Sequence, residues 1–270
     1  MERNLELTML GTGNAAVTKC YNTCFAIRNV NDYFLVDAGG GNGILVQLER
    51  AGIDYTSIHT MFVTHAHTDH ILGAIWIVRM IAQAMKKGKY NGIFDLYGND
   101  KVIDSLELFC RQTLPKSVLA YLEKGIYFHK VNDGDRFEAA HMEVQCFDIH
   151  STKEKQYGFR LTLPDGRILV CLGDEPYNDL NRTYVQGADW LLCEAFCLYA
   201  DKDIFQPYEK HHSTALDAGK LAETLGVRKL LLYHTEDKNL STRKERYGAE
   251  ARQGFSGEIY VPDDLEKIQL

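Results

Sequence analysis

The sequence lacks any mark of a boundary between domains. Its 270 residues contain no proline-, serine- or glycine-rich linker, no low-complexity tract and no repeat of fixed period. The length alone would permit two small domains, but without a boundary we predict a single domain over residues 1–270. Apolar side chains make up 45% of the chain and charged ones 25%, which is typical of a soluble globular protein.

The sequence also lacks a segment that predicts export or a membrane span. Met1-Glu2-Arg3-Asn4 leads directly into a strand-like run, so we expect no signal peptide. The longest apolar stretch, residues 71–85, contains Arg79 and Gln83 and is too short to cross a bilayer. We therefore expect no membrane association and a cytoplasmic location.

An excess of positive charge is missing as well. The net charge of −7 argues against general coating of nucleic acid. Seven cysteines are an odd number in a chain without an export signal, which favours reduced thiols. Cys20 with Cys24, and Cys193 with Cys197, are spaced closely enough to chelate a metal, but we interpret both pairs as ordinary half-buried thiols.

Short β-branched and aromatic runs recur along the chain, and helical patterns separate some of them. The expected strands are Leu5–Leu10, Thr23–Ile27, Tyr33–Val36, Thr60–Val63, Ile93–Tyr97, Ile126–Val131, Met142–Ile149, Gly158–Leu163, Ile168–Leu172, Trp190–Cys193 and Lys229–Tyr233. The expected helices are Asn42–Ala51, Asp69–Lys87, Lys101–Glu123, Thr214–Gly226 and Thr242–Gln253. This order predicts an α/β fold in which two sheets pack face to face with helices outside, a four-layer αββα sandwich.

The densest chemical signal is His65-Ala66-His67-Thr68-Asp69-His70, which places three imidazoles and a carboxylate within six residues. It directly follows the apolar run Met61-Phe62-Val63-Thr64, which predicts a buried strand. A turn after a strand can direct such side chains toward one point, and zinc accepts nitrogen and oxygen donors at close range. We interpret the segment as the nucleus of a metal site rather than as four unrelated polar residues.

Three more donors follow apolar runs elsewhere in the chain: His150, Asp174 and His234. Sites of layered α/β folds gather at the carboxyl ends of strands. Each residue alone could be a structural histidine or a turn aspartate, but together they supply the roughly seven donors that a two-metal hydrolytic site needs.

The order His-X-His-X-Asp-His, followed by His150, Asp174 and His234, resembles the metallo-β-lactamase-fold hydrolases. The resemblance covers essentially the whole chain and implies an αββα sandwich. It implies two metal ions with ligands of this assignment: His65, His67 and His150 for one ion, Asp69, His70 and His234 for the other, and Asp174 as the bridge. Asp37, beside Gly39, falls where the family keeps an aspartate that orients the ligands, although a strand-end turn also explains it.

Further residues resemble the tRNase Z-type branch of this superfamily. They are Leu10-Gly11-Thr12-Gly13, Asn22-Thr23, and His212-Ser213-Thr214 at the start of an expected helix. The resemblance places a non-ligand histidine beside the scissile phosphate, and we assign it to His212 rather than His211 because His212 directly precedes the helix cap. Glu194 matches a family glutamate near the same site. A helix-capping histidine without chemistry is the alternative for His212.

One departure from this branch concerns its tRNA-binding arm, a long glycine-rich segment. Residues 151–173 leave room only for two strands and the turn Pro164-Asp165-Gly166. An acidic chain without this arm has few means of binding structured RNA, whose affinity depends on phosphate contacts. The pattern is closer to armless relatives such as the phosphoribosyl cyclic phosphodiesterases, but their cysteine-rich zinc insertion is missing here.

The resulting prediction is hydrolysis of a small or nucleotide-like phosphodiester by a hydroxide that two divalent ions share. Asp69 also orients the nucleophile, while His212, positioned by Glu194, stabilises the transition state or protonates the leaving oxygen. We expect Zn²⁺, with Mn²⁺ or iron as alternatives because imidazole and carboxylate bind all three. RNA is the less favoured partner, and a homodimer is left open.

Four alternative functions stay open. The first is a tRNase Z-type endoribonuclease that processes tRNA 3′ ends, and the second is a thioester or lactone hydrolase on the same fold, against which the His212 motif speaks. The third is an iron redox enzyme, which the intact Asp69-His70 pair makes less favoured. The fourth is a non-catalytic binding module, which we expect to have lost some of the seven ligands.

Overall fold

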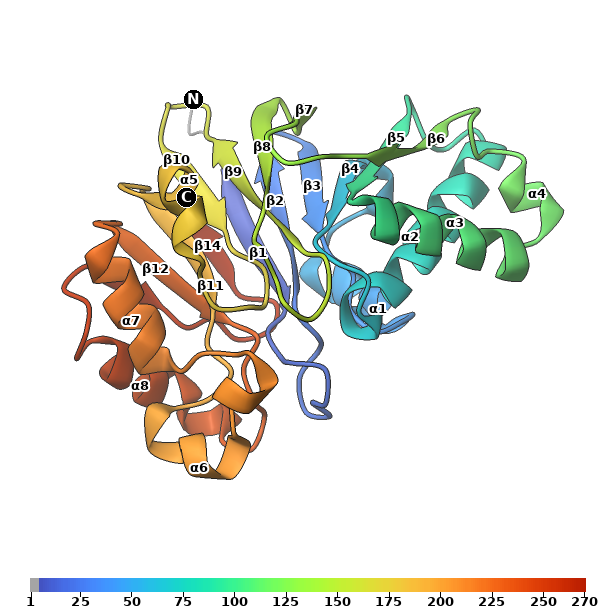
Figure 1. The fold of residues 1–270 in the computed structure, drawn as a ribbon. Coiled ribbons are helices and arrows are strands. Elements are labelled where there is room, and N and C mark those ends of the chain that lie inside the picture. Colours follow the sequence, from blue (N-terminus) through green and yellow to red (C-terminus); the bar gives the residue numbers. More distant parts are fainter. Residues whose placement is uncertain (1–4) are drawn as a thin grey trace.

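The computed structural model describes residues 5–270 and consists of two seven-stranded sheets packed face to face, with helices on the outer faces (Figure 1). This is the four-layer αββα sandwich that the sequence predicts. The first four residues, which belong to the segment where no signal peptide is expected, lie outside the described residues. None of the helices within residues 5–270 combines the length and the apolar character needed to cross a membrane.

The two sheets have matching layouts. The first contains, from edge to edge, β14 (Lys267–Gln269), β1 (Glu6–Gly11), β2 (Cys24–Asn29), β3 (Asp32–Val36), β4 (Ile58–Val63), β5 (Phe94–Gly98) and β6 (Ile126–Lys130). The second contains β13 (Glu258–Tyr260), β12 (Lys229–Tyr233), β11 (Trp190–Glu194), β10 (Ile168–Cys171), β9 (Tyr157–Thr162), β8 (Met142–Asp148) and β7 (Arg136–Ala139). Strands β3–β6 are parallel to one another, as are β10–β13, and the other neighbours are antiparallel.

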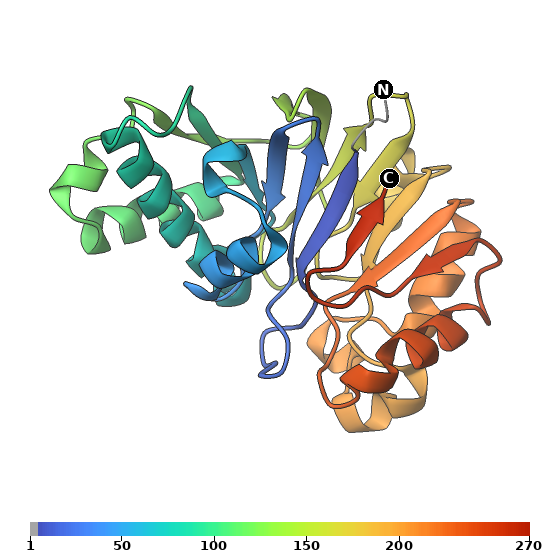
Figure 2. The ribbon, with the colours of Figure 1, turned by 180° about the vertical axis from the view of Figure 1, so that it is seen from behind.

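The sequence patterns located all strands except β7, β13 and β14, each of which has only three or four residues. Strand β14 pairs with β1, so the last strand of the chain completes the edge of the sheet that the first strand begins (Figure 2). Its single buried residue, Ile268, gives too short a pattern for recognition from sequence.

Helices α1 (Gly43–Ala51), α2 (Thr68–Lys86) and α3 (Asp100–Thr113) cover the first sheet, and α7 (Ala215–Thr224) and α8 (Leu240–Ala251) cover the second (Figure 1). Three one-turn helices complete the set: α4 (Lys116–Leu119), α5 (Arg182–Val185) and α6 (Lys202–Phe205). The expected continuous helix over residues 101–123 is wrong. It breaks at Leu114, which is extended, because Pro115 disfavours helical backbone in the residue before it.

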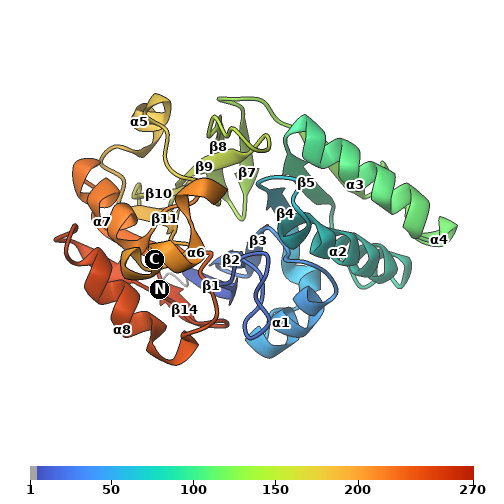
Figure 3. The same cartoon turned by 60° about the horizontal axis from the view of Figure 1, so that its bottom comes forward.

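The aromatic centre of the molecule lies between the sheets. The rings of Phe34 and Phe62 each meet Phe159 edge to face, with ring centroids 5.6 Å apart in both pairs. Phe34 and Phe62 come from the first sheet and Phe159 from the second, so these contacts fix the sheets against each other. The rigid sandwich fixes the positions of the loops at its lower edge in Figure 1. The view in Figure 3 brings this lower edge forward.

Candidate metal centre

The histidine-rich segment occupies the turn between β4 and α2. His65 and His67 lie in the turn, while Asp69 and His70 belong to the first turn of α2. A carboxylate is favourable at this position because the amino end of a helix carries partial positive charge. One short segment therefore supplies four candidate donors, two from the extended turn and two from the start of the helix.

Two further donors enter from the second sheet. Asp174 follows β10 and the left-handed Gly173, and His234 directly follows β12. His234 itself has a φ of +59°, an unusual backbone conformation for a residue other than glycine. Such strained positions concentrate at functional sites, and here the turn at the end of β12 directs the imidazole toward Asp174.

Asp174 lies at the centre of the cluster. Its Oδ2 atom is 3.6 Å from Nε2 of His65, 3.8 Å from Nε2 of His70 and 3.5 Å from Nε2 of His234. Two neighbouring groups of donors each have ligand atoms within 4.8 Å of one another: His65, His67 and Asp174 in one, and Asp69, His70 and His234 in the other. Asp174 and His234 form a third such group with His212. An oxygen between two groups of donors is the arrangement that a bridging ligand requires.

The chemistry of the donors fits divalent metal ions. His70 Nε2 and Asp174 Oδ1 are buried without a hydrogen-bond partner, and such orphaned polar atoms are costly unless something coordinates them. Burial lowers the pKa of His65 and of His234, which favours the neutral imidazole that a metal binds. Burial acts to raise the pKa of Asp174, but the neighbouring histidines hold it well below its usual value, so the carboxyl is ionised.

Outer hydrogen bonds orient the candidate ligands. Asp37 Oδ2 is 2.8 Å from Nδ1 of His70 and accepts a hydrogen bond from the Thr64 hydroxyl at 2.9 Å. That hydroxyl is 3.0 Å from Nδ1 of His65, and Thr23 Oγ1 is 3.2 Å from Nδ1 of His234. The position of Asp37 agrees with the orienting function expected from the sequence. Thr64 was not identified as a site residue, because nothing in a lone threonine after a strand signals such a contact.

The structure does not bring His150 into this cluster. Strand β8 ends at Asp148, and Oδ1 of Asp148 accepts the backbone N–H of His150 at 2.8 Å. His150 then adopts a φ of +59° and its side chain is exposed. It lines an adjoining cavity together with Glu175 and His211, and His212 lines both this cavity and the one at the cluster. This arrangement differs from the expected ligand set because the chain turns at Asp148 before it reaches the histidine.

His212 lies beside the cluster, as expected, and His211 does not. The His212 ring is buried against Phe196 and its centroid is 5.4 Å from that of His234. Its Nδ1 atom faces Glu194 Oε2 at 3.7 Å and has no hydrogen-bond partner. His211 is exposed and lies 3.1 Å from the Thr152 hydroxyl.

Burial moves the pKa values of this pair in opposite directions. It raises the pKa of the fully buried Glu194 to about 8 and lowers that of His212 to about 3. Glu194 accepts backbone hydrogen bonds from Ser213 at 2.5 Å and Phe196 at 3.1 Å, which fix the carboxyl group. At neutral pH the Glu194 carboxyl therefore carries its proton and the His212 imidazole is neutral.

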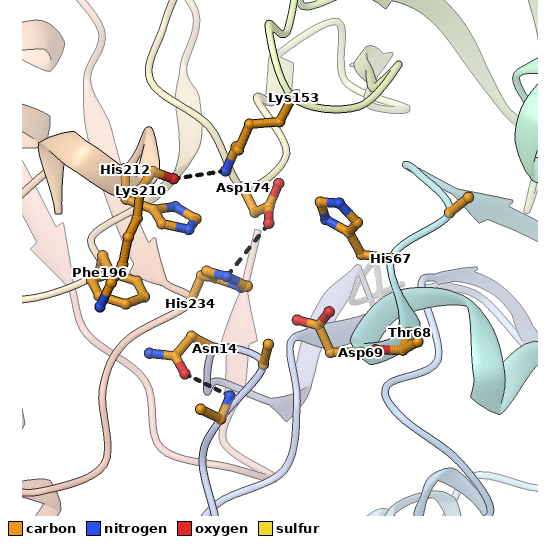
Figure 4. Close-up of a pocket in the computed structure, with 13 residues that line it drawn as sticks. Asn14, His67, Thr68, Asp69, Lys153, Asp174, Phe196, Lys210, His212 and His234 are labelled. Atoms are coloured by element: carbon orange, nitrogen blue, oxygen red, sulfur yellow. Dashed lines mark hydrogen bonds and ion pairs between the residues drawn. The ribbon is translucent and has the colours of Figure 1, made fainter.

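The candidate donors open into a cavity of about 550 Å³ (Figure 4). His67, Asp69, Asp174, His212 and His234 line it from the two sheets. Ala66 and Thr68 of the histidine-rich segment also line it. Six further lining residues were not identified from the sequence: Asn14, Ala15, Ala16, Lys153, Phe196 and Lys210. They come from loops that only the folded chain brings together. No local spacing pattern could have revealed them.

Residues 5–255 of the chain match the protein family described as "Anti-Pycsar protein Apyc1". Among individual relatives, the Ribonuclease Z of Thermobifida fusca (strain YX) is 27% identical over an alignment of 315 positions including gaps, which covers 98% of this chain and 94% of the relative. The Ribonuclease Z of Methanothermobacter thermautotrophicus is 27% identical over an alignment of 316 positions including gaps, which covers 98% of this chain and 97% of the relative.

Solved structures share the fold at lower identity. The metallo-β-lactamase fold protein YhfI from Bacillus subtilis has a TM-score of 0.78 at 20% identity, with 98% of each chain covered. The short form of human tRNase Z has a TM-score of 0.75 at 20% identity, again with 98% of each chain covered. The chain belongs to the Anti-Pycsar protein Apyc1 family and is a tRNase Z-like, metal-dependent hydrolase of the metallo-β-lactamase fold.

Proposed function

We propose that this protein is a phosphodiesterase that uses two divalent metal ions to hydrolyse a small or nucleotide-like phosphodiester. The observation that carries the proposal is the position of Asp174 Oδ2, between 3.5 and 3.8 Å from three buried histidines of two donor groups. A single carboxylate between two groups of donors is typical of two-metal hydrolytic sites.

In this proposal His65, His67 and Asp174 hold one ion, and Asp69, His70 and His234 hold the other together with Asp174. His150 stays a predicted ligand of the first ion, which requires its side chain to turn inward. When bound, the ions supply Lewis acidity toward the phosphoryl group and increase the acidity of water. We propose Zn²⁺, because the donors are nitrogen and oxygen atoms in two compact groups, with Mn²⁺ or iron as alternatives.

The remaining chemistry falls to side chains around the donors. His212 stabilises charge on the phosphoryl oxygens or protonates the leaving oxygen, and Glu194 fixes and supplies the proton. Asp69, whose carboxylate faces the cavity (Figure 4), orients the attacking water in addition to binding metal. Nδ1 of His212 lies 3.7 Å from Glu194 Oε2, so a small shift of the imidazole toward the carboxyl would allow the proton to pass between them.

The size of the cavity supports a small substrate. About 550 Å³ is in the range of pockets that hold small ligands. Among the described residues, the segment between His150 and Asp174 forms β9, β10 and a tight turn, with no projecting arm to hold a folded RNA. The named Ribonuclease Z relatives support pre-tRNA as the second candidate substrate. All seven cysteines are free, which supports the proposed cytoplasmic location.

A substrate panel with elemental analysis tests the proposal. Purified protein should contain about two divalent ions per chain, a number that follows from the two-metal mechanism. It should hydrolyse bis-(p-nitrophenyl) phosphate and a member of a panel of cyclic nucleotides and cyclic ribose phosphates. Cleavage of pre-tRNA alone would establish the second candidate instead. Turnover of thioesters or lactones without any phosphodiester would contradict the proposal. Gel filtration of the same sample tests the homodimer.

A further inference from the structure

Two lysines line the catalytic cavity, and they differ in how their ammonium groups are used. Lys210 Nζ donates to the carbonyl of Phe205 at 2.7 Å and lies 5.2 Å from the centre of the Phe196 ring. Lys153 Nζ donates to the carbonyl of Lys210 at 3.0 Å (Figure 4). It also lies 3.5 Å from the buried carboxylate of Glu175. Among the described residues these are the two polar partners of the Lys153 ammonium group.

The Lys153 ammonium retains capacity for a ligand. It carries three protons, and the Lys210 carbonyl takes one of them. Glu175 Oε1 already accepts a hydrogen bond from the Ser151 hydroxyl at 2.6 Å, so Lys153 shares this carboxylate. The Lys153 side chain is 23% exposed and lines the same cavity as Asp174 and His212. At least one N–H is therefore free to meet a group in the cavity.

The backbone around Lys153 is held in place from two sides. The Ser151 hydroxyl accepts the N–H groups of residues 153 and 154, both at 3.2 Å. On one side Thr152 contacts His211, and on the other Asn99 donates to the carbonyl of Lys155 at 2.8 Å. A restrained loop loses little conformational freedom when its side chain binds a ligand, which favours a defined contact over a mobile surface charge.

The charge of Lys153 also reaches the reacting groups. Lys153 lines the same cavity as His212, Asp174 and His234. Two carboxylates, Asp69 and Asp174, line the same cavity, and both are candidate metal ligands. A lysine in this position adds a positive charge at the side of the cavity, which attracts an anionic group in addition to any bound metal.

We propose that Lys153 is a phosphate-binding catalytic residue whose ammonium contacts a non-bridging phosphoryl oxygen of the bound diester. Phosphoryl transfer is accelerated mainly by positioning and by cations that neutralise charge on these oxygens. Lys153 supplies such a cation from the loop after β8, across the cavity from the first turn of α2. The inference rests on the proposed phosphodiesterase function.

The chain offers a matched control for testing this proposal. Lys155 belongs to the same loop, but its ammonium pairs with Asp100 at 2.7 Å and it does not line the cavity. We therefore compare K153M, K153R and K155M as metal-loaded proteins. The measurements are metal content, the dissociation constant of inorganic phosphate by calorimetry, and kcat and KM for the best diester.

We expect K153M to keep its metal, to bind phosphate about 10- to 100-fold more weakly, and to lose a similar factor in kcat/KM, as for a lost charge-assisted hydrogen bond. K153R should recover much of both properties, and K155M should match wild type. Wild-type phosphate binding by K153M overturns the proposal even if turnover falls, because Lys153 then acts only by holding the loop to Lys210. Should K153M fold poorly, the same phosphate titration on K153Q decides. Failure of the wild type on every diester contradicts the proposed function instead.

Discussion

The imidazole of His212 lies flat against the phenyl ring of Phe196, with ring centroids 4.6 Å apart and an angle of 4° between the planes. The same Phe196 donates its backbone N–H to Glu194 Oε2, which lies 3.7 Å from Nδ1 of His212. One residue therefore fixes the imidazole through its ring and the partner carboxyl through its backbone. The orientation of His212 depends on packing as much as on hydrogen bonding.

Replacing Phe196 with leucine should lower turnover without removing metal. The smaller side chain leaves His212 free to tilt, and small misplacements of a catalytic group can cost up to about 100-fold in rate. We expect F196L to reduce kcat by about 10-fold with little change in metal content, measured by steady-state kinetics and elemental analysis. F196Y, which keeps the ring, is the control and should stay close to wild type. Equal rates for F196L and wild type would show that the stacking has no catalytic effect.

Glu194 should set the alkaline limit of activity. Its raised pKa of about 8, next to a His212 whose pKa is lowered to about 3, places the proton on the carboxyl at neutral pH. A mechanism that needs this proton loses activity as the pH rises through about 8, with kcat/KM falling about 10-fold per unit above it. E194Q cannot titrate, so its profile should be lower overall and should lack this limb. An unchanged limb in E194Q would assign the proton to another group.

The sequence predicted those parts of the site that are local. His65, His67, Asp69 and His70 lie within six residues, so a single turn followed by a single helix start is enough to bring them together. Asp174 and His234 were found because parallel strands deliver their carboxyl ends to one edge of a sheet. The layered fold itself follows from hydrophobic runs whose lengths and spacing distinguish strands from helices.

The rest depends on contacts between distant segments. His150 also follows a strand, but a hydrogen bond to Asp148 and a left-handed φ turn it away from the cluster. Phe196 and Lys153 enter the cavity from loops whose paths no pattern encodes. The approach of α2 to the first sheet is equally hidden: a Cβ at Gly73 would lie 1.9 Å from the carbonyl oxygen of Ala38, so this glycine permits a contact that sequence spacing does not indicate.

Titration of two histidine variants, H150A and H211A, with metal tests whether His150 is a ligand. His150 and His211 are both exposed, have left-handed φ values of 59° and 56°, and line the same cavity. If His150 turns inward to bind the first ion, H150A should bind that ion more weakly, by about 10-fold or more, because metal affinity depends on the number of ligands. H211A should bind metal like wild type. Isothermal titration with Zn²⁺ measures both, and D174N, which loses the central carboxylate charge, provides the reference for a damaged site.

Equal Zn²⁺ affinities for H150A, H211A and wild type would remove His150 from the ligand set. The six clustered donors would then form the whole metal site. A loss in H150A that H211A shares would instead indicate that both histidines act through the loop around Thr152.

Arg243 should be a main source of stability for the loops beneath the site. Its side chain is 2% exposed, and its guanidinium donates to the hydroxyls of Thr12 and Thr235 at 2.9 and 3.0 Å and to the carbonyl of Pro262 at 2.8 Å. Thr235 directly follows His234, so Arg243 ties a candidate ligand to the loop after β1. R243M leaves these acceptors without their donor, and we expect a loss of about 3 kcal/mol in the free energy of unfolding.

Urea unfolding of the metal-free protein measures this loss without the contribution of bound ions. Arg246 on the same helix provides the control, because its guanidinium pairs with Asp201 at 3.3 Å and its side chain is 39% exposed. Such partly exposed ion pairs contribute less than about 1 kcal/mol, so R246M should unfold close to wild type. If R243M proves as stable as R246M, the loops after β1 and β12 are held by their direct backbone hydrogen bond from Thr235 N–H to the Thr12 carbonyl, 3.0 Å long, and Arg243 is dispensable.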